Sequence, residues 1–322
     1  MHPVLFEIPG IGFPIRSFGV LVAAGIFLAI WVWGKLLARH GDDREKDPLR
    51  GSQVALWVII GVLVGARLMY VTVEASRYWS ADLSPAQVAW LDDRASDALP
   101  ALSPEERETA LAVAVGHDFL HDPMRILFLW QGGLVMYGGL FGGILFGAWS
   151  AKRRGLDVWN AFDTALVPSF LGLAVGRWGC LLVGDDYGKV VPEAWKHLSF
   201  PITIQVPPAE WLEAHSESLF DRELAGQVIW ATQVWMSVNG LLIALVGWLL
   251  LRRRRRYGVA GAVMLLIYAV TRSTIEAFRG DSIRGLWFAG TVSTSQLVSI
   301  GVGIVAILLL VLRPGKLAPR AT

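Results

Sequence analysis

Charged residues at the ends of long apolar segments are the side chains of this chain that could carry out chemistry. Arg177 follows an almost uncharged apolar run, residues 158–175, and Asp185 and Asp186 come shortly after it. Placing an arginine deep in a bilayer costs about 2.5–3.5 kcal/mol even on the lenient scale of insertion experiments. A guanidinium at such a position therefore needs a partner, which can be an acidic side chain or an anionic ligand such as a phosphate.

A second polar set has the spacing of one helical face near the C-terminus. Its members recur at intervals of four, four and three residues and are Tyr268, Arg272, Glu276 and Arg279. Residues three and four apart lie on the same side of an α-helix, so Glu276 can pair with Arg272 across one turn. We predict that this face and Arg177 form a pocket for an anionic lipid headgroup, in which arginines hold the phosphate.

Three other interpretations of these charges stay open on the sequence. Internal ion pairs, between Arg272 and Glu276 and between Arg177 and Asp185 or Asp186, would explain them without a ligand, as would arginines that reach the lipid headgroups. A proton-coupled transporter also carries charges within the membrane, but usually near the midplane and between inverted repeats. The sequence contains no internal repeat, and this favours the headgroup pocket over the transporter.

The composition is that of a membrane protein. Of the 322 residues 54% are hydrophobic and 17% are charged, whereas a soluble domain carries about 25% charged residues. The net charge of +2 gives no indication of nucleic-acid binding. The single cysteine, Cys180, excludes a disulfide framework within the chain and a multi-cysteine zinc site. We expect no metal or cofactor, and we interpret His117 and His121 as surface residues rather than as a metal-binding pair.

Seven segments are apolar and long enough to cross a bilayer, for which about 20 residues are needed. They are residues 17–38, 53–74, 126–149, 158–183, 232–251, 258–278 and 291–312. Glycines recur from Gly132 to Gly147 and would allow a close approach between helices. The first segment is too long for a cleavable signal peptide. The pattern predicts an all-α, polytopic membrane protein with a single membrane domain over residues 1–322.

Lysine and arginine in the short loops predict the orientation, because cytoplasmic loops are enriched in them. Four lie in residues 39–51, three in 150–157 and five in 252–257, whereas the much longer segment 75–125 has four among many acids. The N-terminus is therefore expected outside and the C-terminus inside.

Both long loops then lie outside the membrane. Within residues 75–125, Ser84 and Ser103 are each followed by Pro and, three residues on, by Gln or Glu, which predicts two helix starts in an extracytoplasmic insertion. Residues 184–229 are rich in proline, and residues 200–206 have the composition of a strand, so an irregular lobe or short hairpin is expected.

With this orientation the polar residues gather toward the outer face. Arg177 ends an outward-running helix, and Arg272 lies in the outer third of another. Arg67 and Tyr70 lie near the outer end of the second segment, and Tyr137 falls near the middle of the third. A pocket explains why the charges lie on one side. Arginines that merely reach the lipid headgroups would be distributed over both interfaces.

Five motifs in this order resemble those of the prolipoprotein diacylglyceryl transferase family. They are Gly-Ala-Arg-Leu-Met-Tyr (65–70), Trp-Gln-Gly-Gly-Leu-Val-Met-Tyr-Gly-Gly-Leu (130–140), Gly-Arg-Trp-Gly-Cys-Leu-Leu-Val-Gly-Asp-Asp-Tyr-Gly (176–188), Tyr-x3-Arg-x3-Glu-x2-Arg (268–279) and Ser-Gln-Leu-x-Ser-Ile (295–300). The resemblance covers most of the chain except 75–125. It implies a seven-helix enzyme of the bacterial inner membrane, which moves diacylglyceryl from phosphatidylglycerol to the lipobox cysteine of prolipoprotein signal peptides without a metal.

The resemblance also implies roles for individual residues. Arg177 and Arg272 would hold the phosphate and stabilise the leaving glycerol phosphate, and Glu276 would orient Arg272. Tyr137 and Asp185 would assist the reaction. The other residues implied at the substrate pocket are Arg67, Tyr70, Gly138, Gly139, Gly184, Tyr268, Arg279 and Gln233.

The chain departs from the family pattern where protons would be handled. Tyr137 stands in the position of a family histidine, and a phenol is a weak base near neutral pH because its reference pKa is about 10. Cys180 replaces an asparagine, Asp185 replaces a glutamate, and residues 230–236 lack a histidine and a glutamate of another motif. The alternative is therefore a family member that binds phospholipid or lipoprotein without this transfer, or that uses another acceptor.

Overall fold

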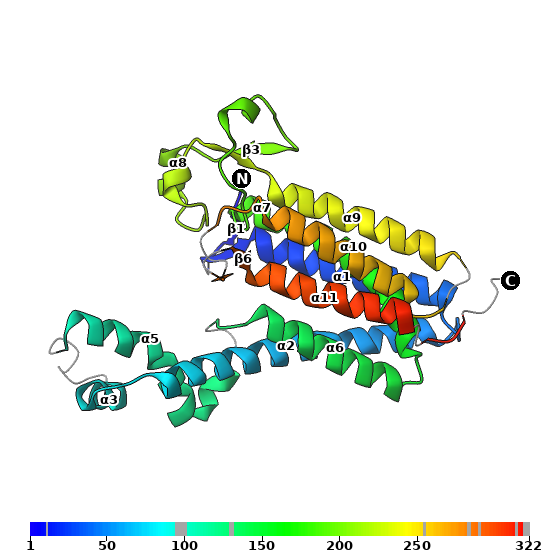
Figure 1. Ribbon diagram of the computed structural model, residues 1–322, viewed down its shortest axis with the longest axis horizontal. Helices are drawn as coiled ribbons and strands as arrows, with labels where there is room; N and C mark the ends of the chain where they lie inside the picture. Colours follow the sequence, from blue (N-terminus) through cyan, green and yellow to red (C-terminus); the bar gives the residue numbers. More distant parts are fainter. Residues whose placement is uncertain are drawn as a thin grey trace. The chain divides into compact units, whose positions relative to one another are not determined.

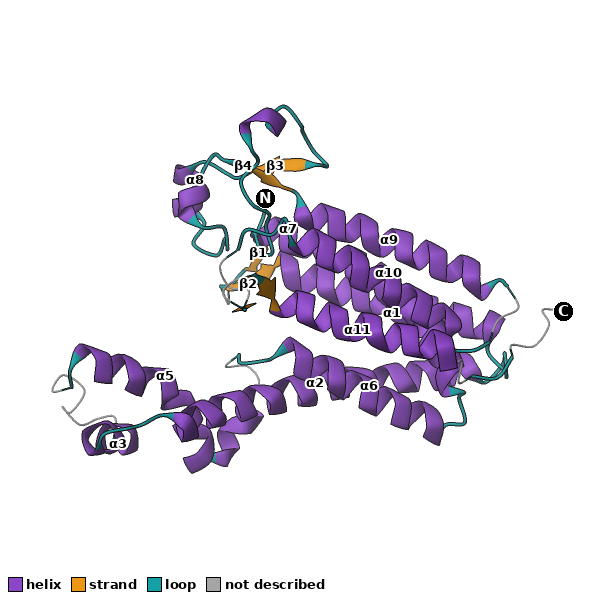
Figure 2. Ribbon diagram, in the orientation of Figure 1, coloured by secondary structure: helices purple, strands orange, loops and turns teal. Residues whose placement is uncertain are grey.

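Helices dominate the structure, a computed structural model that describes residues 1–10, 12–93, 102–128, 132–253, 256–281, 285–288, 291–312 and 315–317 (Figures 1 and 2). The chain divides into two compact units. The first comprises Met1–Ser52 and Leu156–Thr322, and the second comprises Gln53–Gly155. The predicted, mainly helical class is confirmed.

The described part of the first unit contains a bundle of long helices that lie alongside one another in Figure 1. They are α1 (Ser17–His40), α7 (Val158–Val183), α9 (Thr232–Leu251), α10 (Val259–Glu276) and α11 (Thr294–Leu312). Gly25 of α1 lies against Gly172 of α7, where a side chain on either residue would meet the other backbone. Gly179, near the end of α7, packs against Phe18 at the start of α1. The two helices are therefore antiparallel and closely packed.

Buried polar contacts hold the other end of this bundle together. Asp163 of α7 accepts hydrogen bonds from the backbone N–H groups of Gly258 and Gly261, at 3.0 and 2.7 Å. The first N–H groups of a helix lack partners within it, so this carboxylate caps the start of α10. Trp33 Nε1 of α1 donates to Thr164 Oγ1 of α7 at 3.1 Å. These contacts fix α1, α7 and α10 at the end opposite Arg177.

A small lobe lies between α7 and α9, beside the start of α9 in Figure 1. Its elements are the 3-10 helix η3 (Glu193–Trp195), the strand β3 (Thr203–Gln205), the helix α8 (Ala209–Ala214), the 3-10 helix η4 (Arg222–Leu224) and the strand β4 (Val228–Trp230). Strands β3 and β4 are antiparallel. The lobe has an apolar core of its own, which includes Tyr187, Val206 and Ile229. The predicted strand is present, but its partner is distant in the sequence, so the two do not form a short hairpin.

Two short antiparallel sheets precede helices of the first unit. Strands β1 (Val4–Ile8) and β2 (Phe13–Arg16) lead into α1, and strands β5 (Leu286–Trp287) and β6 (Val292–Ser293) lead into α11. We did not predict either sheet, because a search for long apolar segments does not detect strands of two to five residues.

The second unit contains a long helix and several shorter ones. They are α2 (Asp47–Ser80), which begins in the first unit, α3 (Pro85–Asp92), α5 (Pro104–His121), the 3-10 helix η1 (Pro123–Leu127) and α6 (Met136–Arg153). The side chain of Ser84 accepts from the N–H of Gln87, whose side chain accepts from the N–H of Ser84 at 2.7 Å. Ser103 and Glu106 form the same reciprocal cap at the start of α5. Both predicted helix starts are confirmed.

Glycines pack α2 directly against α6. Gly61 and Gly65 of α2 face Gly142 and Gly138 of α6, and a side chain on any of the four would meet the opposite backbone. The predicted role of the glycine-rich segment in close helix packing is confirmed, and Gly138 fills that role.

Six helices of the described residues are long and apolar enough to cross a membrane, and they correspond to six of the seven predicted segments. The third predicted segment, 126–149, differs from the structure, because its α-helix begins only at Met136. Gly132 and Gly133 have φ angles of 84° and 74°, a left-handed conformation that cannot continue an α-helix. Tyr137 therefore lies in the first turn of α6, and its expected place near the middle of a helix was wrong.

Candidate functional site

Asp186 joins two arginines of the first unit, one near the end of α7 and one just after α10. Its carboxylate forms an ion pair with Nη1 of Arg177, near the end of α7, and a second with Nη2 of Arg279, just after α10, at 2.5 Å. The side chain of Asp186 is 22% exposed, and those of Arg177 and Arg279 are 14% and 11% exposed. One of the two predicted pairings for Arg177, the one with Asp186, is therefore present.

The loop that carries Asp186 is held by its own turn and by α9. Gly184 ends α7 with a φ of 82°, which favours glycine and turns the chain away from the helix axis. Thr232 Oγ1, at the start of α9, donates to the carbonyl oxygen of Asp186 at 2.8 Å. Gln233 Nε2 donates to the carbonyl oxygen of Asp185, also at 2.8 Å. Two side chains of α9 thus position the backbone of both aspartates.

Backbone pairing brings the loop after α7 to the segment after α10. The N–H of Lys189 donates to the carbonyl oxygen of Phe278 at 2.8 Å, and the N–H of Gly280 donates to that of Tyr187 at 3.0 Å. A Cβ on Gly280 would lie 2.8 Å from the carbonyl oxygen of Gly188, so the two segments pair this closely because Gly280 has no side chain. The pairing places the carboxylate after α7 next to the guanidinium after α10.

Glu276, the last residue of α10, and Asp281, beyond the end of that helix, extend the network. Arg272 Nη1 lies 2.5 Å from Glu276 Oε2, which confirms the pair predicted from the four-residue spacing. The same oxygen lies 3.4 Å from Arg279 Nη1. Asp281 binds Arg279 through both carboxylate oxygens, at 2.9 Å from Nε and 2.6 Å from Nη2. The side chain of Glu276 is only 1% exposed, so its charge requires these partners.

The ion pairs balance the charges of this network. Three guanidiniums meet three carboxylates, and the six residues are Arg177, Arg272, Arg279, Asp186, Glu276 and Asp281. Internal pairing, one of the interpretations left open by the sequence, therefore accounts for how these charges are buried. A ligand is not required to neutralise them.

The three arginines differ in how many of their own guanidinium nitrogens bind carboxylates. Arg279 binds carboxylates through Nε, Nη1 and Nη2. Within the described residues, Arg177 and Arg272 bind carboxylates through Nη1 alone; Nη1 of Arg177 also lies 3.9 Å from Cys180 Sγ. A guanidinium has five N–H donors, so Arg177 and Arg272 retain donors on Nε and Nη2 that an anion can use.

The two aspartates of the loop have opposite pKa shifts. Burial alone would raise the pKa of the Asp186 carboxyl, but the guanidiniums of Arg177 and Arg279 outweigh it and hold this pKa below its ordinary value. Burial, and then repulsion by Asp186, raise the pKa of Asp185. Asp186 therefore remains ionised as a counterion, whereas Asp185 is the better proton acceptor of the two.

Three further predicted residues of the first unit lie in or near this network. Gly184 forms the turn after α7, and Gln233 holds the loop backbone rather than facing outward, because its side chain is buried. Tyr268 is half-buried in α10, and its ring packs against Phe170 of α7 with a centroid distance of 5.4 Å. Of these, only the hydroxyl-bearing Tyr268 has a functional group suited to contact a ligand.

Arg67 lies in the second unit, surrounded by backbone carbonyl groups. Its guanidinium is buried and donates to five carbonyl oxygens at 2.6–3.3 Å, those of Arg125, Ile126, Phe128, Gly132 and Gly133. Its carbon Cζ also lies 5.1 Å from the ring centre of Phe119 and 5.7 Å from that of Tyr70. This arrangement ties the chain between η1 and α6 to α2, with donors on Nε, Nη1 and Nη2 all in use.

The remaining predicted residues of the second unit lie at the start of α6. Tyr137 is half-buried in the first turn, and Gly138 and Gly139 are buried against α2. Packing with α2 leaves these two glycines little surface for a substrate. Tyr137 thus remains the candidate for proton transfer from this unit.

Sequence reasoning missed Asp281 and Thr232, and it named Asp186 only as a possible partner of Arg177. Asp281 was detectable, because a carboxylate two residues after Arg279 can bind that arginine bidentately. Thr232 acts through a backbone contact with a loop 46 residues away, for which the sequence contains no local signal.

Comparison with known proteins shows that the chain belongs to one family over most of its length. The family described as prolipoprotein diacylglyceryl transferase matches residues 3–95 and 108–312. Proteins named phosphatidylglycerol–prolipoprotein diacylglyceryl transferase are similar to it. That of Synechococcus elongatus is 27% identical over 303 residues, 92% of this chain and 82% of its own. That of Thermus thermophilus is 28% identical over 316 residues, 92% of this chain and 93% of its own. That of Bacillus cereus is 24% identical over 303 residues, 94% and 88% of the two chains.

The depressed pKa of Asp186 predicts how stability depends on pH. A carboxyl whose folded pKa lies below its unfolded value, about 3.9, stabilises the protein above that value and loses this contribution as the pH falls through the folded pKa. We expect Asp186→Asn to lower stability by about 3 kcal/mol near pH 7, since removing one partner of a buried pair leaves uncompensated charge. The midpoint of thermal unfolding in detergent measures this at pH 7 and at steps below pH 5.

Asp186→Asn should also lose less stability than the wild type when the pH is lowered. Glu193→Gln is the matched control, because Glu193 pairs with Lys196 but its side chain is 86% exposed, and such surface pairs contribute little. Equal unfolding midpoints for Asp186→Asn and the wild type at pH 7 would show that the ion pair does not stabilise the fold.

Proposed function

We propose that this chain, which belongs to the prolipoprotein diacylglyceryl transferase family, transfers diacylglyceryl from phosphatidylglycerol to a cysteine thiol of a prolipoprotein signal peptide. The names of its relatives support this proposal. The thiol loses its proton, and its sulfur attacks the glycerol carbon that is bonded to phosphate. A carbon–sulfur bond forms as the carbon–oxygen bond breaks, and the electron pair remains on the departing glycerol phosphate. The reaction needs an acceptor for one proton and stabilisation of the leaving phosphate.

The unused donors of Arg177 and Arg272 carry this proposal. Each is held by one carboxylate through Nη1, so its orientation is fixed while Nε and Nη2 remain for a phosphodiester. A phosphodiester carries one negative charge, and the leaving phosphate gains a second as the bond breaks. Fixed guanidiniums therefore bind the transition state more strongly than the bound lipid, which is the condition for catalysis.

Glu276 and Arg279 position these arginines rather than contacting the lipid. Glu276 binds Arg272 and Arg279 together, and all three nitrogens of Arg279 are engaged with carboxylates. We assign Arg279 the role of linking the two acidic residues Asp186 and Glu276. The wall of the lipid site then includes Tyr268, which belongs to the same helical face as Arg272.

Asp185 is the acceptor we propose for the thiol proton. Burial and the neighbouring charge of Asp186 raise the pKa of Asp185, and a base with a raised pKa is better matched to a thiol, whose reference value is about 8.5. Tyr137 is the second candidate for proton transfer, since it occupies the position of a histidine in the family motif.

The charges of the loops indicate how the chain is arranged in the membrane. We propose that α6 provides a seventh span, that the N-terminus lies outside, and that the lobe over residues 184–229 and the helices within 75–125 are extracytoplasmic. The lysines and arginines of the short loops support this orientation. The protein would then reside in the bacterial inner membrane with the Arg177 site toward the outer leaflet.

Lysine substitutions test whether Arg177 and Arg272 bind the lipid phosphate and whether Arg279 has a structural role. Lysine keeps the charge but loses the planar fork that binds phosphate through two donors. We expect Arg177→Lys and Arg272→Lys to lower the transfer rate by about 10²–10³-fold, the usual effect of losing a transition-state donor. Transfer is measured with labelled phosphatidylglycerol and a lipobox peptide, and retained lipid by mass spectrometry of the purified protein.

Arg279→Lys should instead lower the unfolding midpoint more than Arg177→Lys does, because it breaks more ion pairs. Arg222→Lys, an exposed position in the lobe, is the control and should change neither quantity. Full transfer activity in Arg177→Lys would contradict the headgroup role, and retained lipid without any transfer by the wild type would indicate a lipid-binding family member instead.

The position of Tyr137 predicts a gain of function. A histidine is a better base than a phenol near neutral pH, because its reference pKa is about 6.5, so Tyr137→His should raise the transfer rate at pH 7 and Tyr137→Phe should lower it. The pH profile of kcat distinguishes the two, since the added histidine introduces a new rise near its own pKa. If Tyr137→Phe and Tyr137→His both match the wild type, this residue takes no part in proton transfer.

Accessibility of introduced cysteines tests the orientation. Cys180 is buried, so new cysteines at exposed positions dominate the labelling. A membrane-impermeant maleimide added to intact spheroplasts should label Ser216→Cys in the lobe and should label Lys152→Cys, at the end of α6, only after lysis. The reverse pattern would invert the proposed topology.

A further inference from the structure

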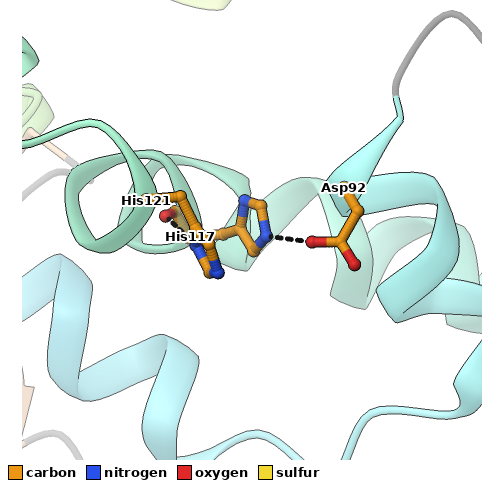
Figure 3. A group of neighbouring side chains, drawn as sticks. All are labelled: Asp92, His117 and His121. Carbon is orange, nitrogen blue, oxygen red and sulfur yellow. Dashed lines mark hydrogen bonds and ion pairs between the residues drawn. The ribbon is translucent and has the colours of Figure 1, made fainter.

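Two histidines and an aspartate meet in the second unit, away from the Arg177 network in sequence (Figure 3). His117 and His121 lie one helical turn apart on α5, and their rings stack with a centroid distance of 4.0 Å. Asp92, the last residue of α3, places Oδ1 3.0 Å from His117 Nε2. One potential ligand atom from each residue lies within 4.8 Å of the other two. The expectation that both histidines are surface residues was wrong for His117, which is 4% exposed.

We propose that Asp92, His117 and His121 bind one divalent transition-metal ion, with zinc as the best match. Imidazole nitrogen and carboxylate oxygen are zinc ligands at about 2.0–2.2 Å, and three protein ligands leave one position open. Ligand atoms around a tetrahedral ion at that distance lie about 3.3–3.4 Å apart. His117 Nε2 and Asp92 Oδ1 are 3.0 Å apart, and all three ligand atoms lie within 4.8 Å of one another, so small side-chain rotations would bring them to this spacing.

The hydrogen bond of His121 Nδ1 leaves the other ring nitrogen, Nε2, able to bind a metal ion. Its Nδ1 lies 2.9 Å from the carbonyl oxygen of His117. A carbonyl oxygen only accepts, so Nδ1 carries the proton, and in the neutral ring Nε2 keeps its lone pair. Metal-bound histidines usually donate their other ring N–H to a carbonyl or carboxylate in this way.

The surroundings of His117 also favour an ion. If Nε2 of the neutral ring donates to Asp92, the lone pair of Nδ1 faces Asp118 Oδ1 at 3.8 Å, and this buried nitrogen has no hydrogen-bond partner among the residues that the structure describes. An ion between Nε2 and Asp92 moves the ring proton to Nδ1, where it faces the Asp118 carboxylate favourably. Asp118 is itself paired with Arg125, as a carboxylate that orients a metal-bound histidine often is.

The site is both supported and accessible. The ring of Tyr78 packs edge-on against His117 and His121, with centroid distances of 5.4 and 6.5 Å. Asp92 has a side chain that is 59% exposed, and His121 is exposed, so an ion can reach the cluster from solvent. A bound ion would connect the last residue of α3 to the last turn of α5. Its role is independent of the proposed transfer reaction.

Metal binding is measured on the full chain in detergent, purified with a tag that lacks histidine and stripped with a chelator. We expect one Zn²⁺ per chain by elemental analysis after dialysis, and visible absorption bands typical of tetrahedral cobalt when Co²⁺ is added instead. His121→Phe keeps a stacked ring and Asp92→Asn keeps an acceptor for His117, so both preserve packing while removing a ligand. Each should lower zinc affinity at least about 10–100-fold, the effect of losing even an outer partner.

His215→Phe is a matched control. Nδ1 of His215 also bonds a carbonyl oxygen four residues earlier, at 2.9 Å, and its ring stacks on Trp211 at 4.0 Å. The control should bind zinc as the wild type does, and zinc should raise the unfolding midpoint of both but not of the two ligand variants. Unfolding midpoints without metal show that each variant is folded.

Two outcomes would overturn the proposal. One is the absence of stoichiometric zinc and of cobalt bands in the wild type, which would leave His117 as an ordinary link between Asp92 and Asp118. The other is zinc binding that is unchanged in both His121→Phe and Asp92→Asn, which would place the ion elsewhere. Neither result depends on transfer activity.

Discussion

The ion pairs of Asp186 are the interaction on which the rest of the site depends. Its carboxylate holds Arg177, at the end of α7, and Arg279, just after α10. Without this carboxylate, two guanidiniums would face each other in a poorly hydrated region, where like charges repel more strongly than in water. Three features position the Asp186 loop for this contact. They are the turn at Gly184, the hydrogen bond from the Thr232 side chain and the paired segments beside Gly280. The ion pairs are thus built into the ends of the helix bundle.

Charge balance allows these arginines to be buried, but it also limits how they can bind a lipid. Among the described residues, the network of three guanidiniums and three carboxylates has no surplus charge to attract an anion from a distance. In the proposed function, recognition then rests on directional hydrogen bonds from those donors of Arg177 and Arg272 that the described carboxylates leave unused. Because one carboxylate already fixes each guanidinium, little conformational entropy is lost when a phosphate binds. In the proposed lipid site, rigidity rather than net charge would be the source of affinity.

Local spacing predicted those parts of the structure that one helix determines. The pair of Arg272 with Glu276 and the helix starts at Ser84 and Ser103 depend on residues three or four apart, and all are present. Contacts between distant segments were not predictable in the same way. The carbonyl groups around Arg67 belong to residues about 60 positions later, and backbone carbonyls leave no mark in a sequence. The late start of α6 follows from glycine φ angles, which residue type permits but does not dictate.

The family resemblance implies a histidine at the position of Tyr137 and a glutamate at that of Asp185, and these differences bear on proton transfer more than on phosphate binding. A shorter carboxylate reaches less far, but burial and the charge of Asp186 raise its pKa, and a carboxylate of higher pKa is a stronger base. The same neighbour has its own pKa lowered by Arg177 and Arg279, so one aspartate is committed to charge balance and leaves the other available for proton transfer. Two adjacent carboxylates with opposite shifts can divide these tasks. In the proposed transfer reaction, the loop after α7 would then supply the base through Asp185.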